Sequence, residues 1–97
     1  MEIKPECILE KTKKHIILVD DNAEFLRSIK TVLEEKYSVS LAISASSAMT
    51  IMGKRKPDLI LLDYDMPICN GKMMLEMIRA DENLKYVPVF CIFLIIA

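Results

Sequence analysis

Residues 58–67 read DLILLDYDMP, a stretch in which apolar residues lead into carboxylates. Four consecutive apolar residues, Leu59 to Leu62, run directly into Asp63, and Asp65 follows two positions later. A short uninterrupted apolar run predicts a strand that is buried on both faces, as in the centre of a parallel sheet. Because parallel α/β folds bind ligands beyond the carboxyl ends of their strands, the two carboxylates are candidate functional groups.

Similar patterns recur along the rest of the chain. Four segments are predicted to be strands: 15–19, 37–42, 59–62 and 87 onward. Three segments between them have the apolar spacing of helices: 25–33, 48–52 ending at Gly53, and 73–78. In the last of these, Met73, Met74, Met77 and Ile78 are predicted to form the buried face. Strands that alternate with helices through short loops predict an α/β fold with a parallel sheet and right-handed crossovers.

The composition excludes several classes of protein. With 97 residues the chain has the length of one domain. Its 13 basic and 14 acidic residues give no excess of positive charge that would favour direct binding of nucleic acid. Cys7, Cys69 and Cys91 form no CxxC pair, which argues against disulfides or zinc and favours a reducing, cytoplasmic setting. The apolar run 87–97 is about half as long as the roughly 20 residues of a membrane helix, so no membrane partner is expected.

The residues before the first predicted strand and the first residue of that strand have no expected catalytic role. Residues 1–13 are polar and aperiodic and are predicted to be a flexible leader, so that the domain occupies residues 14–97. His15, the single histidine, starts the strand at the end opposite to the carboxylates. It is interpreted as a sheet-edge residue and not as a phosphoryl donor.

Acidic residues follow two of the predicted strands. Asp20 and Asp21 end the first strand and Asp63 ends the third, so the carboxylates meet if these strands are neighbours. Two like charges 4 Å apart repel by about 4 kcal/mol at an effective dielectric constant of 20, so such a cluster requires a cation or a raised pKa. Oxygen ligands that leave room for water suit Mg²⁺. Taken separately, Asp20 and Asp21 are also typical of a helix N-cap, and Asp63 of a turn.

Three stretches of the chain carry a family resemblance: HIILVDDN, KPDLILLDYDMP and NGKMMLEMIRADENLKYVPV. This resemblance to the receiver domains of two-component response regulators extends over residues 14–92. It implies a three-layer, flavodoxin-like parallel sheet in which Asp63 accepts a phosphoryl group from a sensor histidine kinase or a small phosphodonor. It also implies an Mg²⁺ site in which Asp21 binds directly, Asp20 binds through water, and Asp65 supplies its backbone carbonyl. The resemblance further implies a module that is not an enzyme in the usual sense but can catalyse its own phosphoryl transfer.

The chain departs from the family pattern at its C-terminal side. The resemblance places a serine or threonine near residue 93, where this chain has Phe93, and a lysine, a fifth strand and further helices beyond Ala97. We therefore expect a fold truncated after the fourth strand, with slower phosphoryl transfer because one positive charge is missing. An apolar strand at a sheet edge also predicts a homo-oligomer that forms through residues 87–97.

Three other interpretations remain open from the sequence. The chain is either a degenerate receiver that acts only as a protein-binding or oligomerising module, or a fragment without a role of its own. In the third, LILLDYD resembles the first motif of haloacid-dehalogenase-like phosphatases, with Asp63 as nucleophile and Asp65 as general acid. Pro67 and the short chain speak against that activity.

Overall fold

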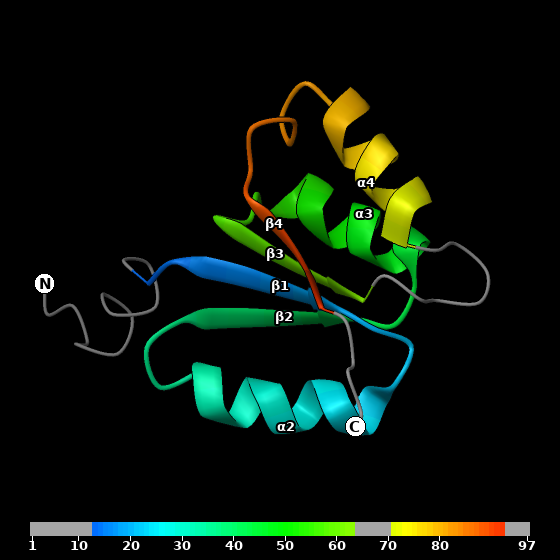
Figure 1. The fold of residues 1–97 in the computed structure, drawn as a ribbon. Helices are drawn as coiled ribbons and strands as arrows, with labels where there is room; N and C mark the ends of the chain where they lie inside the picture. Colours follow the sequence, from blue (N-terminus) through cyan, green and yellow to red (C-terminus); the bar gives the residue numbers. More distant parts are fainter. Residues whose placement is uncertain (1–12, 64–70, 93–97) are drawn as a thin grey trace, which may run out of the picture.

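The computed structural model describes residues 13–63 and 71–92. The described elements, in chain order, are β1 (His15–Val19), α2 (Ala23–Leu33), β2 (Ser38–Ala42), α3 (Ala45–Lys54), β3 (Leu59–Asp63), α4 (Gly71–Ala80) and β4 (Val89–Ile92). The strands form one sheet in the order β2-β1-β3-β4, and every neighbouring pair is parallel. Figure 1 shows α2 on one face of the sheet and α3 and α4 on the other. The predicted three-layer α/β architecture is confirmed.

The two faces of the sheet are buried to different extents. Alternate residues of a strand point to opposite faces, and Ile60 and Leu62 of β3 lie toward α3 and α4 with no exposed surface. Their neighbours Leu59 and Leu61 lie on the α2 face and are only half-buried. The main core therefore lies between the sheet and the two helices α3 and α4.

Polar side chains start the first two helices where the sequence changes from strand to helix. The side chain of Asn22 caps α2 by accepting a hydrogen bond of 3.1 Å from the backbone N–H of Phe25. The hydroxyl of Ser44 caps α3 by accepting one of 3.2 Å from the N–H of Ser47. Each cap satisfies a backbone donor that has no partner within the helix, and it fixes the helix directly after a strand end.

Several predicted boundaries were wrong. Helix α3 starts at Ala45 and passes through Gly53, because the Ser44 cap begins it three residues earlier than the apolar pattern suggests. Strand β4 starts at Val89, two residues later than predicted. The polar leader that we predicted over residues 1–13 lies outside the described residues except for Lys13.

The buried face of α4 is narrower than predicted. Met74 and Ile78 are fully buried, whereas Met73 and Met77 are 50% and 42% exposed. Residues three or four positions apart share one side of a helix, and only the side that carries Met74 and Ile78 packs on the sheet. In the described part of the chain, no helix has both the length and the apolar character needed to cross a membrane.

Candidate acidic metal site

The sheet brings the predicted carboxylates together at the carboxyl ends of two adjacent strands. Val19 of β1 pairs with Leu62 of β3, so Asp20 and Asp63 follow at neighbouring positions. One carboxylate oxygen from each of Asp20, Asp21 and Asp63 lies within 4.8 Å of the others. The structure thus places these three side chains where the sequence predicted them, whereas their roles remain predictions.

Asp20 is the most constrained of the three acidic residues. It is only 4% exposed, and its backbone N–H donates to the carbonyl oxygen of Ala42 at 3.0 Å. Its Oδ1 accepts a hydrogen bond of 2.9 Å from the N–H of Asn22. The carboxyl group is therefore fixed between the end of β1 and the start of α2.

The surroundings of Asp20 raise the pKa of its carboxyl group from 3.8 to about 6. The largest cause is burial, which disfavours the charged form, followed among the raising causes by repulsion from Asp63. Side-chain hydrogen bonds with Asp21 and Asp63 act in the same direction, while the hydrogen bond from Asn22 opposes them. A proton on Asp20 thus relieves part of the repulsion that three close carboxylates create.

The cluster suits a hard divalent cation. Asp20 is buried, Asp63 is half-buried and Asp21 is exposed, so the group opens toward solvent on one side. Carboxylate oxygens with access to water are the ligands that Mg²⁺ prefers. A cation would offset the burial and the repulsion from Asp63 that raise the pKa of Asp20. The donor set and its charge therefore fit the metal that the sequence predicts.

Asp65, expected to offer its backbone carbonyl to the metal, lies outside the described residues, as does Phe93. Both therefore stay as predictions.

The opposite end of the sheet holds a polar cluster that the sequence analysis missed. His15 is not at a sheet edge, because β1 is flanked by β2 and β3, and its side chain is 2% exposed. Its Nε2 lies 2.7 Å from Oγ of Ser40 and its Nδ1 3.4 Å from the carbonyl oxygen of Lys56. Its backbone N–H donates to Oδ2 of Asp58 at 2.7 Å. The available sequence signal was that a polar residue directly precedes each of two apolar runs, His15 in one case and Asp58 in the other. Only the strand register shows that these two residues meet.

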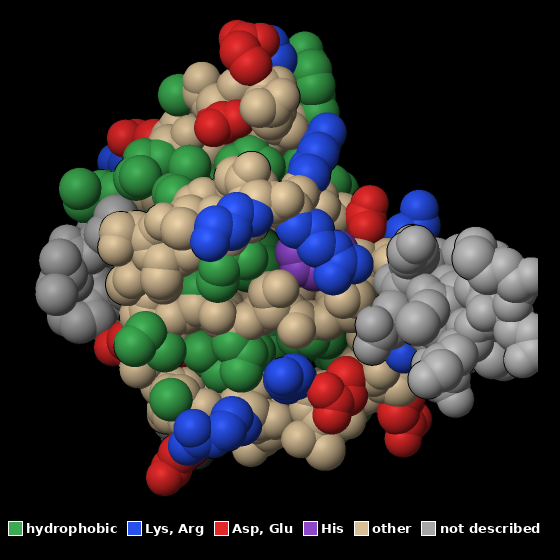
Figure 2. Space-filling view, turned by 180° about the vertical axis from the view of Figure 1, so that it is seen from behind, with side chains coloured by type: hydrophobic (Ala, Val, Ile, Leu, Met, Phe, Trp, Pro, Cys, Tyr) green, Lys and Arg blue, Asp and Glu red, His purple; other side chains and the backbone are tan. Residues whose placement is uncertain are grey.

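Burial lowers the pKa of His15 below its ordinary value of 6.5, and the positive charge of Arg55 acts in the same direction. The hydrogen bond to the Lys56 carbonyl and the charge of Asp58 oppose this shift. A neutral ring with its proton on Nδ1 satisfies both ring contacts, so His15 serves the packing of the sheet. Figure 2 shows Lys and Arg side chains on the surface around the single histidine.

Comparison with known proteins gives one consistent family. The model of the response regulator receiver domain family matches residues 16–93. Chemotaxis protein CheY-3 of Vibrio cholerae is 35% identical over 89 residues, which cover 90% of this chain and 68% of that protein.

Solved structures agree with the sequence comparison. The N-terminal domain of a response regulator receiver protein from Methanoculleus marisnigri JR1 superimposes with a TM-score of 0.74 at 32% identity. The match covers 77% of this chain and 62% of that chain. The Mn²⁺-bound form of response regulator Rcp1 gives a TM-score of 0.68 at 28% identity, over 78% of this chain and 62% of that one.

Proposed function

Because the chain belongs to the response regulator receiver domain family, we propose that it receives a phosphoryl group on Asp63 in a two-component signalling pathway. Receiver domains are phosphoryl-accepting signalling modules and not enzymes in the usual sense, and they generally bind Mg²⁺ at an acidic pocket. The observation that carries the proposal is the position of Asp63 within 4.8 Å of the carboxylates of Asp20 and Asp21.

In the proposed transfer, a carboxylate oxygen of Asp63 attacks the phosphorus of the donor and forms the O–P bond of an aspartyl phosphate. The bond from phosphorus to the donor nitrogen or oxygen breaks, and its electron pair leaves with the donor group. The apolar residues of β3, of which Leu62 is fully buried, hold the nucleophile at a fixed point. Its placement therefore derives from the core.

Asp20, Asp21 and Asp63 would hold Mg²⁺, together with the backbone carbonyl of Asp65. When bound, the metal neutralises negative charge on the phosphoryl oxygens. The backbone N–H of Asp20 donates to the carbonyl oxygen of Ala42, and its Oδ1 accepts a hydrogen bond from the N–H of Asn22. The carboxyl group is thus held in place and needs little reorganisation to take part in the metal site.

Intact-mass spectrometry after incubation with acetyl phosphate and Mg²⁺ tests this proposal. The expected result is the gain of one phosphoryl group, which disappears without Mg²⁺ and in Asp63→Asn. Asp58→Asn is the matched control, since it alters the same residue type next to the other end of β3. No gain in folded protein that binds Mg²⁺ would contradict the proposal and favour a receiver that only binds other proteins.

The partners follow from the same proposal. We expect a sensor histidine kinase or a small phosphodonor as the source of the phosphoryl group, in the cytoplasm. Because Phe93 occupies the position where the resemblance implies a serine or threonine, we propose that phosphorylation does not act through a hydroxyl group there. We expect that adding a hydroxyl group in Phe93→Thr leaves the output of a kinase-dependent assay unchanged, and a gain of output in this variant would contradict the point.

Self-association through β4 is a separate part of the proposal. Among the described strands, β4 pairs only with β3, and Phe90 on it is 62% exposed. An apolar edge strand favours pairing between chains. Light scattering of the chain and of Phe90→Lys is expected to show a larger mass for the unaltered protein, and a monomer at high concentration would contradict self-association.

A further inference from the structure

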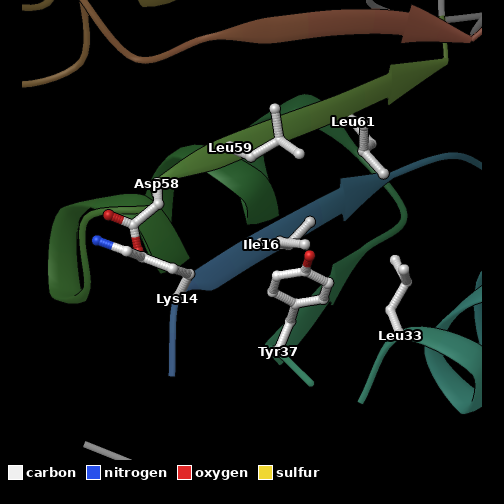
Figure 3. Close-up of a pocket in the computed structure, with 7 residues that line it drawn as sticks. All are labelled: Lys14, Ile16, Leu33, Tyr37, Asp58, Leu59 and Leu61. Carbon is white, nitrogen blue, oxygen red and sulfur yellow. The ribbon is translucent and has the colours of Figure 1, made fainter. Parts of the chain in front are cut away.

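A cavity of about 280 Å³ lies between the C-terminal half of α3 and the loop that follows α4. It shares no lining residue with the acidic cluster. Its lining residues are Met49, Met52, Gly53, Lys56, Asp81, Asn83 and Leu84. The larger groove on the α2 face differs from it, because that groove is lined mainly by apolar side chains, with Lys14 and Asp58 at one end (Figure 3). The smaller cavity thus combines apolar contacts with an acid, a base and an amide.

Gly53 gives the first reason to regard this cavity as a binding site. It is the last residue but one of α3, and in a helix glycine is less favourable than any residue except proline. Neither the backbone nor the packing requires a glycine here, because its φ angle is not positive and an added Cβ would meet no atom within 4 Å. The fold therefore does not account for the missing side chain, whereas glycine lets a ligand approach the helix backbone closely.

Two charged groups of the lining give the second reason. Asp81 is half-buried, and its Oδ1 accepts a hydrogen bond of 2.8 Å from the N–H of Asn83. Within the described part of the chain, no donor bonds to its Oδ2, and the ammonium group of Lys56 has neither a hydrogen bond nor an ion pair. The fold therefore leaves one anionic oxygen and one cation at the cavity to interact with a ligand.

The loop that forms one wall of the cavity is held in place. Arg79 of α4 donates hydrogen bonds to the carbonyl oxygens of Lys85 at 2.6 Å and Val87 at 3.0 Å. Inside the loop, the backbone N–H of Leu84 donates to the carbonyl oxygen of Asp81 at 3.2 Å. The cavity is therefore formed before a ligand binds, and binding does not require the loop to be ordered.

The size and the charges of the cavity select a class of ligand. Its volume is close to the lower end of the range for ligand pockets, roughly 300 Å³, which suits a small metabolite. The carboxylate of Asp81 and the negative end of the α3 dipole favour an ammonium group, and Lys56 favours a carboxylate. Met52 and Leu84, each 3% exposed, form an apolar floor. We propose that the cavity binds a free amino acid with an apolar side chain, such as leucine.

Titration of the isotope-labelled chain with L-leucine, followed by two-dimensional NMR, tests the proposal. The expected result is a saturable shift of the amide signals of Gly53 and residues 81–84, with a dissociation constant of about 1 mM or lower. Leucinamide, which lacks the carboxylate, and 4-methylpentanoate, which lacks the ammonium group, should each bind about tenfold more weakly. Shifts that do not saturate up to about 10 mM leucine, methionine or valine would overturn the proposal. Equal binding of leucine and both analogues would overturn the assignment to amino acids.

Matched pairs of variants locate the charges that hold the ligand. Lys56→Gln should weaken leucine binding about tenfold, whereas Lys54→Gln, outside the lining, should leave it unchanged. Asp81→Asn should also weaken it about tenfold, since the amide oxygen still accepts from the N–H of Asn83 but carries no charge. Glu82→Gln is its neutral control. Unchanged affinity in both Lys56→Gln and Asp81→Asn would place the ligand elsewhere and overturn the proposal.

A third pair tests the space beside the helix. Gly53→Leu should reduce leucine binding at least tenfold because the new side chain occupies part of the cavity, while Gly53→Ala should retain most of the affinity. Asp63→Asn alters only the acidic cluster and should bind leucine like the unaltered chain. Loss of leucine binding in folded Asp63→Asn would assign the ligand to the acidic cluster and overturn a separate site.

Discussion

The two ends of the sheet use buried polar groups in opposite ways. At the carboxyl ends of β1 and β3, Asp20 and Asp63 lie close together with Asp21, and the pKa of Asp20 rises to about 6. At the amino ends, His15 and Asp58 join the same two strands through hydrogen bonds. One end holds like charges that favour a cation, whereas the other holds donors and acceptors that satisfy one another.

The carboxyl ends of β1 and β3 are thus suited to binding a ligand, whereas their amino ends are suited to stabilising the fold. A buried group whose hydrogen bonds are satisfied stabilises the fold, but a cluster of like charges destabilises it unless a ligand binds. The carboxyl end is therefore expected to respond to Mg²⁺ and the amino end is not. Substitutions at one end of the sheet can therefore be compared with substitutions at the other.

The largest effect is expected from the metal itself. Mg²⁺ at 100 times its dissociation constant should raise the free energy of unfolding by about 2.7 kcal/mol, because it binds the folded state. Thermal or urea unfolding with and without Mg²⁺ measures this change. Asp63→Asn should reduce it strongly, whereas Asp58→Asn should respond to Mg²⁺ like the unaltered chain. An equal response of both variants would contradict a site at the carboxyl end.

The next effect is the removal of repulsion without metal. Asp20→Asn should raise the free energy of unfolding at pH 8 in Mg²⁺-free buffer by roughly 1–2 kcal/mol. The rise in the pKa of Asp20 from 3.8 to about 6 corresponds to about 3 kcal/mol, and the buried amide retains part of the cost of burial that is the largest cause of this rise. The amide oxygen can still accept the hydrogen bond from Asn22. The same variant should bind Mg²⁺ more weakly in calorimetric titration. Lower stability without metal would show that the carboxylate contributes more through its hydrogen bonds than it costs through repulsion.

A smaller effect is expected from the polar contact at the amino end. Asp58→Ala removes the acceptor for the backbone N–H of His15, and it should lower the free energy of unfolding by about 1 kcal/mol, the usual net contribution of one hydrogen bond. Urea unfolding measures the change. Lys56→Ala, a neighbour whose exposed side chain makes no described contact with His15, is the control and should change little. If Asp58→Ala changed the increase in the free energy of unfolding that Mg²⁺ causes, the two ends of the sheet would not be independent.

The smallest effect is a difference in pH dependence. The raised pKa of Asp20 gives stability that is complete below pH 3.8 and is lost as pH rises through about 6. The lowered pKa of His15 gives the opposite sign: its contribution is present above pH 6.5 and is lost as pH falls toward the lowered value. The two slopes therefore oppose each other between about pH 4 and 6.5.

Substitutions at Asp20 and His15 allow the contribution of each residue to the pH dependence of stability to be measured separately. In Mg²⁺-free buffer, Asp20→Asn should leave a protein that loses stability as pH falls below 6.5. Adding His15→Gln, whose amide cannot titrate, should remove that loss. Urea unfolding at several pH values gives both curves. A loss that persists in the double variant would assign it to other groups.

Local sequence patterns were sufficient to predict the helices, the strands and the candidate acidic residues. Apolar runs such as Leu59 to Leu62, followed by carboxylates, are local patterns that fix strand positions and the residues at strand ends. The order of strands and helices then determined the parallel α/β architecture. Asp20, Asp21 and Asp63 could be named for the same reason, because parallel strands bring their carboxyl ends to one edge.

The residues that meet across the sheet could not be predicted from local sequence patterns. His15 contacts Ser40 and Asp58 because β1 lies between β2 and β3 in one particular register, which depends on pairing over long sequence distances. The exposure of Met73 and Met77 and the half-burial of Leu59 have the same origin. A local pattern says which residues are apolar, but burial depends on which element packs against them.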